Sequence, residues 1–404
     1  MRGDMPAATS LLSRAAGLYE VEAPQRLELL PELGAALIDV GELADAGLVL
    51  GEAIELARSA GDARIEWRAR LELAEMGKEQ RAAEELRQQA EQAIRVFEQH
   101  EDDKSLSKAW RLVGESLLLR CRGAAAEEAL GRAVAHARKA GDLGEETESL
   151  RWRARAMLLG PVPVPEGIAR CEAARTASGG RPIAVAGLSL ILGAFAGMQG
   201  RFDDARGLIA TAQAIFTELG LTFRLAQSAF VSGRVELIAD EPAAAERELR
   251  RGYEILESMG EKSYYFPILA SLLAAAVCEQ GRWQEALALT EVSERAATPG
   301  DLAANVLWQA VRGKALCGLA DTEQGERLAL ESVRLAEGSD FLWDRANALM
   351  SLADVLRVRG RGREAAGAIQ QAVELYELKG IDVSAEKARA LLADPIGVGI
   401  RPNE

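Results

Sequence analysis

The hexapeptide GRWQEA (residues 281–286) is the clearest copy of a pattern that recurs along the whole chain. In each copy a small or turn-forming residue is followed five positions later by a small one, and successive copies lie about forty residues apart. The other copies begin at Gly3, Gly41, Cys121, Gly200, Asp240, Ala320 and Gly360, with weaker ones near Gln80 and Gly160. Self-similarity at this period is typical of repeat architectures, so we treat the chain as an array of units.

Two further landmarks keep the same register. The second small residue is followed at a fixed distance by a glycine, which predicts a helix of about four turns that ends in a left-handed C-cap. These glycines are Gly61, Gly141, Gly220, Gly260 and Gly380. Before each turn, a small residue recurs inside an otherwise helical run, at Gly34, Gly114, Gly193, Gly233, Ala274, Gly313 and Ala353. Because glycine costs about 1 kcal/mol in a helix interior, its repeated use predicts close approach of two helices.

Each unit is therefore predicted to be a helical hairpin, made of helix A, a short turn and helix B. In the second repeat, helix A is expected over residues 24–40 and helix B over residues 43–60. A single hairpin cannot bury its apolar stripe, whereas stacked hairpins can. The predicted fold is all-α, a right-handed superhelical solenoid of about nine to ten hairpins with contacts mainly between neighbours.

The units resemble tetratricopeptide repeats. The small residue in helix A, the Gly-x-aromatic turns at residues 200–202 and 281–283, and the small residue that opens helix B carry this resemblance. The repeat period of about forty residues and the amino-acid sequence of residues 26–62 are similar to those of the C-terminal repeat arrays of bacterial signalling ATPases, including cyclase-linked and LuxR-type transcriptional regulators. The resemblance covers nearly the whole chain, and it implies a non-catalytic sensing or interaction module.

Composition supports an all-helical chain and excludes several functions. Hydrophobic residues make up 49% of the sequence but aromatic ones only 5%, which suits closely packed helices. The net charge of −14 argues against a nucleic acid as the main partner, since that affinity depends on dense Lys and Arg. Four widely spaced cysteines indicate neither a zinc site nor a disulfide scaffold. Cys278 and Cys317 occupy equivalent positions one repeat apart. They are expected to be either separate buried thiols or a neighbouring pair.

The sequence predicts a cytoplasmic protein that does not enter a membrane. Its first ten residues have neither a basic region nor an apolar core of the kind found in signal peptides. The longest apolar stretch, residues 183–198, is short for a bilayer span and contains three glycines. It is expected to be a buried helix A.

The predicted divisions follow the repeats. Residues 1–160 are expected to hold the N-terminal repeats, and residues 161–165 to form a proline-rich break with extended backbone. Residues 166–395 are expected to hold the C-terminal repeats, which end in a capping helix, and residues 396–404 a tail. The first unit lacks a helix A, which indicates a piece of a longer protein, a partner that covers this end, or a short atypical terminal helix.

The sequence offers no constellation for catalysis, and we expect neither a cofactor nor a metal. It contains no phosphate loop, no Gly-x-Ser-x-Gly and no His-Glu-x-x-His motif. Only two histidines occur in 404 residues, which leaves little for acid-base chemistry. An enzyme on a helical scaffold is the least favoured of three hypotheses.

The expected binding surface is the concave face, which helix A lines. Counting back from each turn by tetratricopeptide geometry gives the candidate groove residues Trp67, Arg70, Arg111, Leu190, Phe230, Arg234, Ile268, Leu307 and Lys314. Basic residues outnumber acidic ones at the counted positions, so an amphipathic helix or a segment ending in a carboxylate would fit. Alternatively, the aromatic and aliphatic members belong to the core between repeats.

Two functional hypotheses remain ahead of the enzyme. The first is the sensor module of a bacterial signalling ATPase or transcriptional regulator, which binds a protein, a peptide or a small effector. The second is a free-standing adaptor that recognises a peptide. The size of the native polypeptide distinguishes them.

Overall fold

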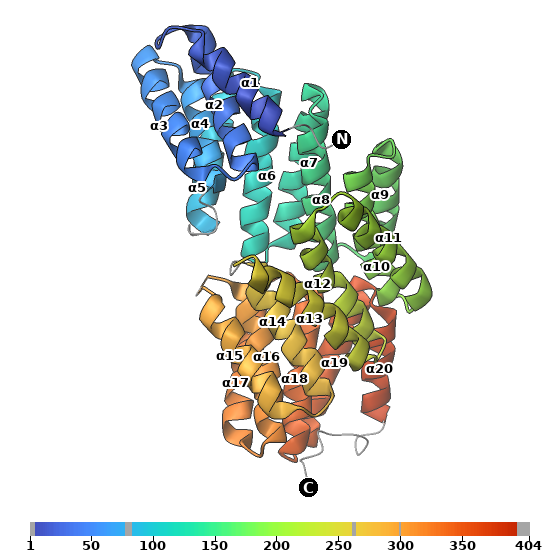
Figure 1. Cartoon of the computed structure of the whole chain (residues 1–404). Helices are drawn as coiled ribbons and strands as arrows, with labels where there is room; N and C mark the ends of the chain where they lie inside the picture. The colour runs from blue at the N-terminus through green and yellow to red at the C-terminus, as the bar shows by residue number, and fades with distance from the viewer. Residues whose placement is uncertain (1–4, 77–82, 261–263, 299, 394–404) are drawn as a thin grey trace. The chain divides into compact units, whose positions relative to one another are not determined.

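The computed structural model describes residues 5–76, 83–260, 264–298 and 300–393. Within these ranges the chain forms twenty helices and no strand (Figure 1). The helices are α1 (Met5–Gly17), α2 (Pro24–Asp39), α3 (Leu43–Ala60), α4 (Ala63–Met76), α5 (Ala83–Gln99), α6 (Asp103–Leu119), α7 (Gly123–Ala140), α8 (Leu143–Leu159), α9 (Val164–Ala177), α10 (Pro182–Met198), α11 (Phe202–Glu218), α12 (Thr222–Ile238), α13 (Pro242–Ser258), α14 (Tyr265–Glu279), α15 (Trp283–Ala296), α16 (Leu302–Gly318), α17 (Thr322–Glu337), α18 (Leu342–Val358), α19 (Gly362–Lys379) and α20 (Asp382–Ala393).

The helices form the predicted hairpins. Helices α2 and α3 begin and end within one residue of the expected helix A and helix B. Even-numbered helices take the place of helix A and pack on each other as well as on their partners, as α14 does on α15 and α16. The all-α prediction is confirmed. The turn predicted at Gly3, the weaker copy near Gln80 and the tail at residues 396–404 lie outside the described ranges.

The repeated turn residue has a left-handed backbone. Positive φ angles occur at Gly41, Cys121, Gly200, Asp240, Gly281, Ala320 and Gly360, the turn positions predicted from the repeat. Three of these residues are not glycine, although side chains disfavour this conformation. The geometry of the hairpin turn is therefore kept even where the residue type does not suit it.

The small residues inside helix A mark close helix contacts, as predicted. A Cβ atom built on Gly34 would lie 2.3 Å from the Leu50 side chain, and one on Gly233 would lie 2.3 Å from Leu249. The equivalent distance from Gly114 to Leu130 is 2.4 Å. Glycine is retained because helix B places a leucine directly against the helix A backbone.

The chain divides into two compact units. The first comprises residues 1–116 and 128–149, and the second comprises residues 117–127 and 150–404. The division falls within α6, α7 and α8, so residues 161–165 lie wholly inside the second unit. The boundary proposed at residues 160 and 166 stays a prediction. Pro163 has the extended backbone expected there, with φ −62° and ψ 145°. The expectation is wrong for Val164 and Pro165, which form the start of α9, because proline is tolerated in the first turn of a helix.

The first unit has its core between paired helices. Leu30 of α2 packs with Leu50 and Ala53 of α3 and with Ala69 of α4. Small residues at these positions allow the helices to approach, and leucine fills the remaining space. We call the even-numbered helices, which take the place of helix A, the inner helices. Those of this unit thereby lie close enough for their long charged side chains to meet.

Within the second unit, segments far apart in sequence are joined. Asp340 accepts hydrogen bonds from the backbone N–H groups of Gly123 at 2.6 Å and Ala124 at 2.9 Å. Lys379 is fully buried, and its Nζ donates to the carbonyl of Met157 at 2.6 Å and to those of Gly160 and Val162. Contacts between neighbouring repeats are therefore supplemented by contacts across more than two hundred residues.

The buried amine of Lys379 is held by backbone oxygens. Burial lowers the pKa of Lys379 to about 7, although the charge of Asp340 opposes this shift. The three carbonyl acceptors favour the protonated amine, because an ammonium group offers three N–H donors. This clamp ties the end of α19 to the loop between α8 and α9.

Apolar segments lie in the interior. Most of α10, which contains the longest apolar stretch of the sequence, is buried. In the described ranges, no helix combines the length and the apolar character that crossing a membrane requires.

Candidate functional site

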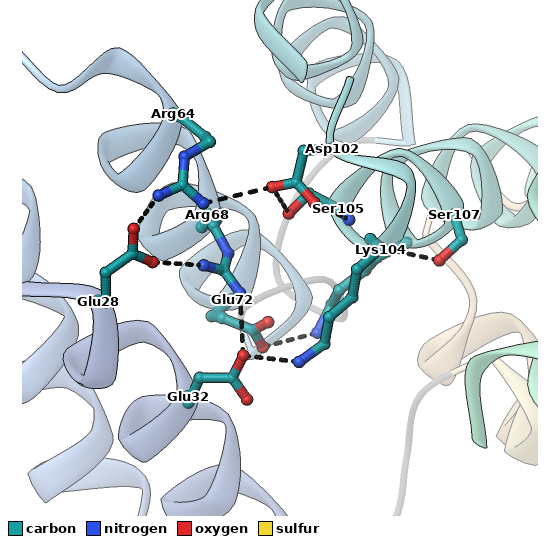
Figure 2. A network of polar contacts seen from close by, with 10 residues as sticks. Glu28, Glu32, Arg64, Arg68, Glu72, Asp102, Lys104, Ser105 and Ser107 are labelled. Carbon is teal, nitrogen blue, oxygen red and sulfur yellow. Dashed lines mark hydrogen bonds and ion pairs between the residues drawn. The ribbon is translucent and has the colours of Figure 1, made fainter. Parts of the chain in front are cut away.

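Ion pairs link the inner helices of the first unit, and Figure 2 shows their N-terminal part. Arg64 and Arg68 on α4 both contact Glu28 on α2, with 3.1 Å between Arg68 Nη1 and Glu28 Oε2. Arg68 Nη2 also donates to Glu32 at 2.9 Å, and Lys104 Nζ on α6 donates to the same carboxylate at 2.6 Å. Although burial opposes it, Lys104 and Arg68 lower the pKa of Glu32.

Lys108 continues this chain of charges between α4 and α6. Its Nζ lies 2.6 Å from a carboxylate oxygen of Glu72 and 2.6 Å from one of Glu75. Burial raises the pKa of Glu72, and Glu75 adds to that shift while Lys108 opposes it. Two carboxylates therefore share one ammonium group.

Arg111, a predicted groove residue, is buried among three carboxylates. Its Nη2 lies 3.0 Å from Glu75 and its Nε 2.5 Å from Glu145 on α8, and it also contacts Glu115. Only 5% of the residue is exposed. The charge of Arg111 is thus already used within the unit rather than presented to a ligand.

Acidic groups outnumber basic groups in this arrangement, which we name the first-unit network. Its seven acidic residues are Glu28, Glu32, Glu72, Glu75, Asp102, Glu115 and Glu145, and its five basic residues are Arg64, Arg68, Lys104, Lys108 and Arg111. Desolvation, with the charges of Glu75 and Glu148, raises the pKa of nearby Asp39, and Lys108 opposes this. The expected basic excess does not occur in this unit, because glutamates from adjacent inner helices accompany each cation.

A cleft of about 170 Å³ opens within the network. Its lining combines apolar and charged side chains. The apolar members are Pro31, Ala35, Leu71 and Phe97, and the charged members are Glu32, Arg68, Glu72, Lys104, Lys108, Asp142 and Glu145. A partner here would meet a small apolar surface surrounded by charges of both signs.

Trp67 and Arg70 lie beside this cleft's lining rather than in it. The Arg70 guanidinium lies 4.9 Å from the Trp67 ring centre, and its Nη2 contacts Glu66 at 2.6 Å. Ala74 lies midway in the sequence between Gly34 and Gly114, so the register of this repeat is one residue later than a count from Gln80 assumes. Counting from Gln80 therefore selects Trp67, while its neighbour Arg68 faces the network.

In the second unit, Arg234 on α12 is buried between aromatic rings. Its guanidinium carbon lies 4.6 Å from the ring centres of both Phe230 and Trp343. Its Nη2 lies 2.7 Å from Asp344 Oδ1, but that oxygen has no aligned hydrogen bond. The contact is thus a close ion pair rather than a directed hydrogen bond.

Arg155 on α8 stacks on the same phenylalanine. Its guanidinium carbon lies 4.6 Å from the ring centres of Phe230 and Tyr265, and its Nη1 donates to the Tyr265 hydroxyl at 2.6 Å. The sequence Tyr265, Arg155, Phe230, Arg234, Trp343 forms what we name the arginine–aromatic column. Each stacked pair contributes about 0.5–2 kcal/mol, most where the cation is desolvated.

The remaining predicted residues lie elsewhere in the second unit. Leu190 lines a cleft of about 40 Å³ together with Phe230 and Arg155. Ile268 and Leu307 are buried in the core. Lys314 Nζ lies 2.8 Å from both Glu279 and Asp354. The structure thus brings Leu190, Phe230 and Arg234 together. Ile268 and Leu307 belong to the core instead, and Lys314 is paired with carboxylates.

Comparison with known proteins supports the repeat fold. No family model and no curated protein matches the sequence. Among solved structures, a Rap protein complexed with Competence and Sporulation Factor is similar over 92% of this chain and 99% of that chain, with a TM-score of 0.61 at 13% identity. The chain is a tetratricopeptide-like repeat array. At this identity the likeness concerns the fold alone.

Two further solved structures are similar to this array at lower scores. One is NprR in complex with its cognate peptide NprX, with a TM-score of 0.48 and 14% identity over 72% of this chain and 83% of that chain. The other is a signal transduction ATPase with numerous domains and a tetratricopeptide repeat sensor, from Pyrococcus horikoshii. Its TM-score is 0.44 at 13% identity, over 85% of this chain and 54% of that chain.

The sequence-based candidates omit the acidic half of the first-unit network and also omit Arg155. The same counting rule reaches Glu28, which lies thirteen residues before Gly41. Arg155 lies six residues before Pro161, so counting from the weak copy at Gly160 misses it by one residue. Both signals were present, but only the packing of the repeat array shows which register applies.

The array's cysteines are all free and buried. Burial raises the pKa of the Cys278 thiol to about 12 and that of the Cys317 thiol to about 11. A thiol with so high a pKa is a poor nucleophile at neutral pH. In the ranges that the structure describes, no group of three or more His, Cys, Asp or Glu side chains is placed to hold a metal ion.

Proposed function

We propose that this repeat array is a non-catalytic module that binds a protein or peptide along the charged cleft of the first unit. The observation that carries the proposal is the lining of that cleft, where apolar side chains are surrounded by charged groups from four inner helices. Apolar contact supplies affinity, and fixed charges supply orientation and selectivity. The fold shared with a Rap protein in complex with a factor is consistent with this role.

The charge balance favours a basic partner segment. Acidic groups exceed basic ones in the first-unit network, and the pKa of Asp39 is raised through desolvation and through Glu75 and Glu148. Asp39 does not line the cleft, but its charge interacts with that of Lys108, which does. A lysine or arginine of a partner that extends from the cleft to Asp39 would relieve that repulsion. The partner would then carry basic side chains next to apolar ones, rather than the terminal carboxylate expected from counting positions.

The experiment is selection from a random peptide library displayed on phage, followed by anisotropy titration of enriched peptides. Enriched peptides are expected to carry lysine or arginine, and to bind more weakly at higher ionic strength. Asp39→Asn should weaken their binding by about three- to tenfold. The matched control is Asp45→Asn, which removes another exposed aspartate, from α3, an outer helix. Enriched peptides without basic residues, with unchanged affinity for the Asp39→Asn chain, would refute the proposed site.

We infer two settings for such a module, the sensor region of a signalling ATPase or transcriptional regulator and a free-standing adaptor. The sequence resemblance supports the first setting. Leu11 and Leu18, in and after α1, are 64% and 85% exposed, as a surface that meets a further part of the protein would be. An antibody to this region, used on a denaturing gel of source cells, decides between them. A band far above 43 kDa supports the sensor region, and a band at 43 kDa supports the adaptor.

A further inference from the structure

Arg155 is a buried cation with no carboxylate partner among the described residues. Only 7% of the residue is exposed, and its one hydrogen bond is the one from Nη1 to the Tyr265 hydroxyl. Its other neighbours are the rings of Phe230, Tyr264 and Tyr265. A buried lysine could lose its proton in such surroundings, but an arginine stays charged.

The unused part of Arg155 has a specific shape. Its Nε and Nη2 atoms are buried and have no hydrogen-bond partner in the part of the chain that the structure describes. These two atoms form one edge of the guanidinium plane, with two N–H groups parallel to each other. That edge matches two oxygens of a carboxylate or phosphate, and such bidentate pairs are among the strongest charged hydrogen bonds.

The other buried arginines show what is missing. Arg111 contacts three carboxylates, and Arg234 lies 2.7 Å from Asp344. Leaving a buried charge unpaired is strongly unfavourable, and stacking on aromatic rings offsets only part of that cost. In a chain of net charge −14, an arginine buried without an anion points to an anion supplied from outside.

The surroundings of Arg155 are suited to an anion. It lines a cleft of about 40 Å³, which exceeds the space that one water molecule needs. Arg151 and Arg224 line the same cleft, as does the amide of Gln227. Among the described residues that line it, none is acidic. The Arg155 guanidinium, beside a small and largely apolar space, raises the local concentration of anions.

We propose that this cleft of the second unit is an oxyanion site, in which the Nε and Nη2 edge of Arg155 binds the carboxylate or phosphate group of a small ligand. The aromatic column holds the guanidinium plane in place, and the Tyr265 hydroxyl fixes the orientation of that plane through Nη1. The site lies in the other unit from the cleft assigned to the protein or peptide partner, and it does not depend on that assignment.

The test is isothermal titration calorimetry of the whole chain with inorganic phosphate and, separately, with acetate, in chloride buffer at constant ionic strength. Saturable binding at millimolar concentrations is expected for at least one of them. Binding of phosphate alone, or of acetate alone, identifies the group that the site prefers. Arg155→Met should abolish this binding. Arg155→Lys should weaken it at least tenfold, because it keeps the charge but lacks the two-pronged edge.

Controls separate this site from general attraction to arginine. Arg132 also stacks on a ring, 4.6 Å from the centre of Trp110, but Glu128 already pairs with it at 2.7 Å. Arg132→Met should leave anion binding unchanged. Circular dichroism checks the fold of each variant, and the Arg155→Lys chain decides the matter if Arg155→Met does not fold. No saturable binding to the wild-type chain, or equal binding to the Arg155→Lys chain, would overturn the proposal.

Discussion

The contact between Gly233 and Leu249 gives the sharpest test of the repeat packing. Gly233 lies inside α12, and a Cβ atom added there would meet three atoms of Leu249 at 2.3, 2.6 and 2.7 Å. Ordinary contacts between carbon atoms are about 3.5–4.0 Å. Leu249 is fully buried in α13, so its side chain cannot move into solvent to avoid the added group. Gly233→Ala therefore forces the two helices apart.

Two opposing effects determine the free energy of unfolding of the Gly233→Ala chain. Replacing glycine by alanine in a helix interior stabilises by about 1 kcal/mol. Overpacking a close contact costs about 1–3 kcal/mol, and more where the neighbour cannot move. Because three Leu249 atoms are affected, we expect the upper end of that range, and hence a net loss of about 2 kcal/mol.

The assay is urea unfolding, with hydrogen exchange to show whether the loss lies in α12 and α13, as expected when repeats share stability mainly with neighbours. The matched control is Gly207→Ala in α11, where an added Cβ meets nothing within 4 Å. It should stabilise by about 0.5–1 kcal/mol. Combining Gly233→Ala with Leu249→Ala should cost less than the two separate effects together, because the shortened side chain makes room. Equal stabilisation by Gly233→Ala and Gly207→Ala would refute the packing argument.

Substitutions also test three other features of the structure. Ala320→Gly should stabilise by about 1 kcal/mol, because Ala320 has φ 68°, and the reverse change Gly360→Ala should lose a similar amount; equal unfolding midpoints for the two variants would contradict this. Lys379→Met should destabilise by about 3 kcal/mol by leaving three buried carbonyls without donors, whereas Lys387→Met, at a half-exposed position, should cost under about 1 kcal/mol; thermal unfolding measures both. Burial raises the pKa of Asp301 from 3.8 to about 6, although the hydrogen bond from the Ala304 N–H opposes this shift. The folded wild-type chain therefore holds this proton more tightly than the unfolded chain, and it should lose up to about 3 kcal/mol of stability as the pH rises from 4 to 6. The Asp301→Asn chain should avoid that loss, and parallel curves of stability against pH for the two chains would contradict this.

The candidate site was only partly predictable from the sequence. Helix A positions could be counted, and this counting found Phe230 and Arg234, which the structure places in one column. It also selected Arg111, but could not tell that Glu75 and Glu145 contact it as well as its own-helix neighbour Glu115, because these two come from α4 and α8. Arg155 was missed because the helical hairpin that it belongs to has an atypical turn, at the proline-rich segment. A register error of one residue turns a helical side chain by about 100°, enough to exchange a groove residue for its neighbour.

The sequence by itself determined the helices, their ends and their pairing. These features depend on interactions within about forty residues, such as the glycine that ends a helix or that admits a leucine from the next helix, and each leaves a mark at a fixed spacing. Only the tertiary structure decided which charges are paired and which repeats meet across long separations. Lys379 reaches Met157, and Arg155 reaches Phe230 and Tyr265, across separations of 222, 75 and 110 residues. Such contacts depend on the packing of the intervening helices, so no local pattern in the sequence reports them.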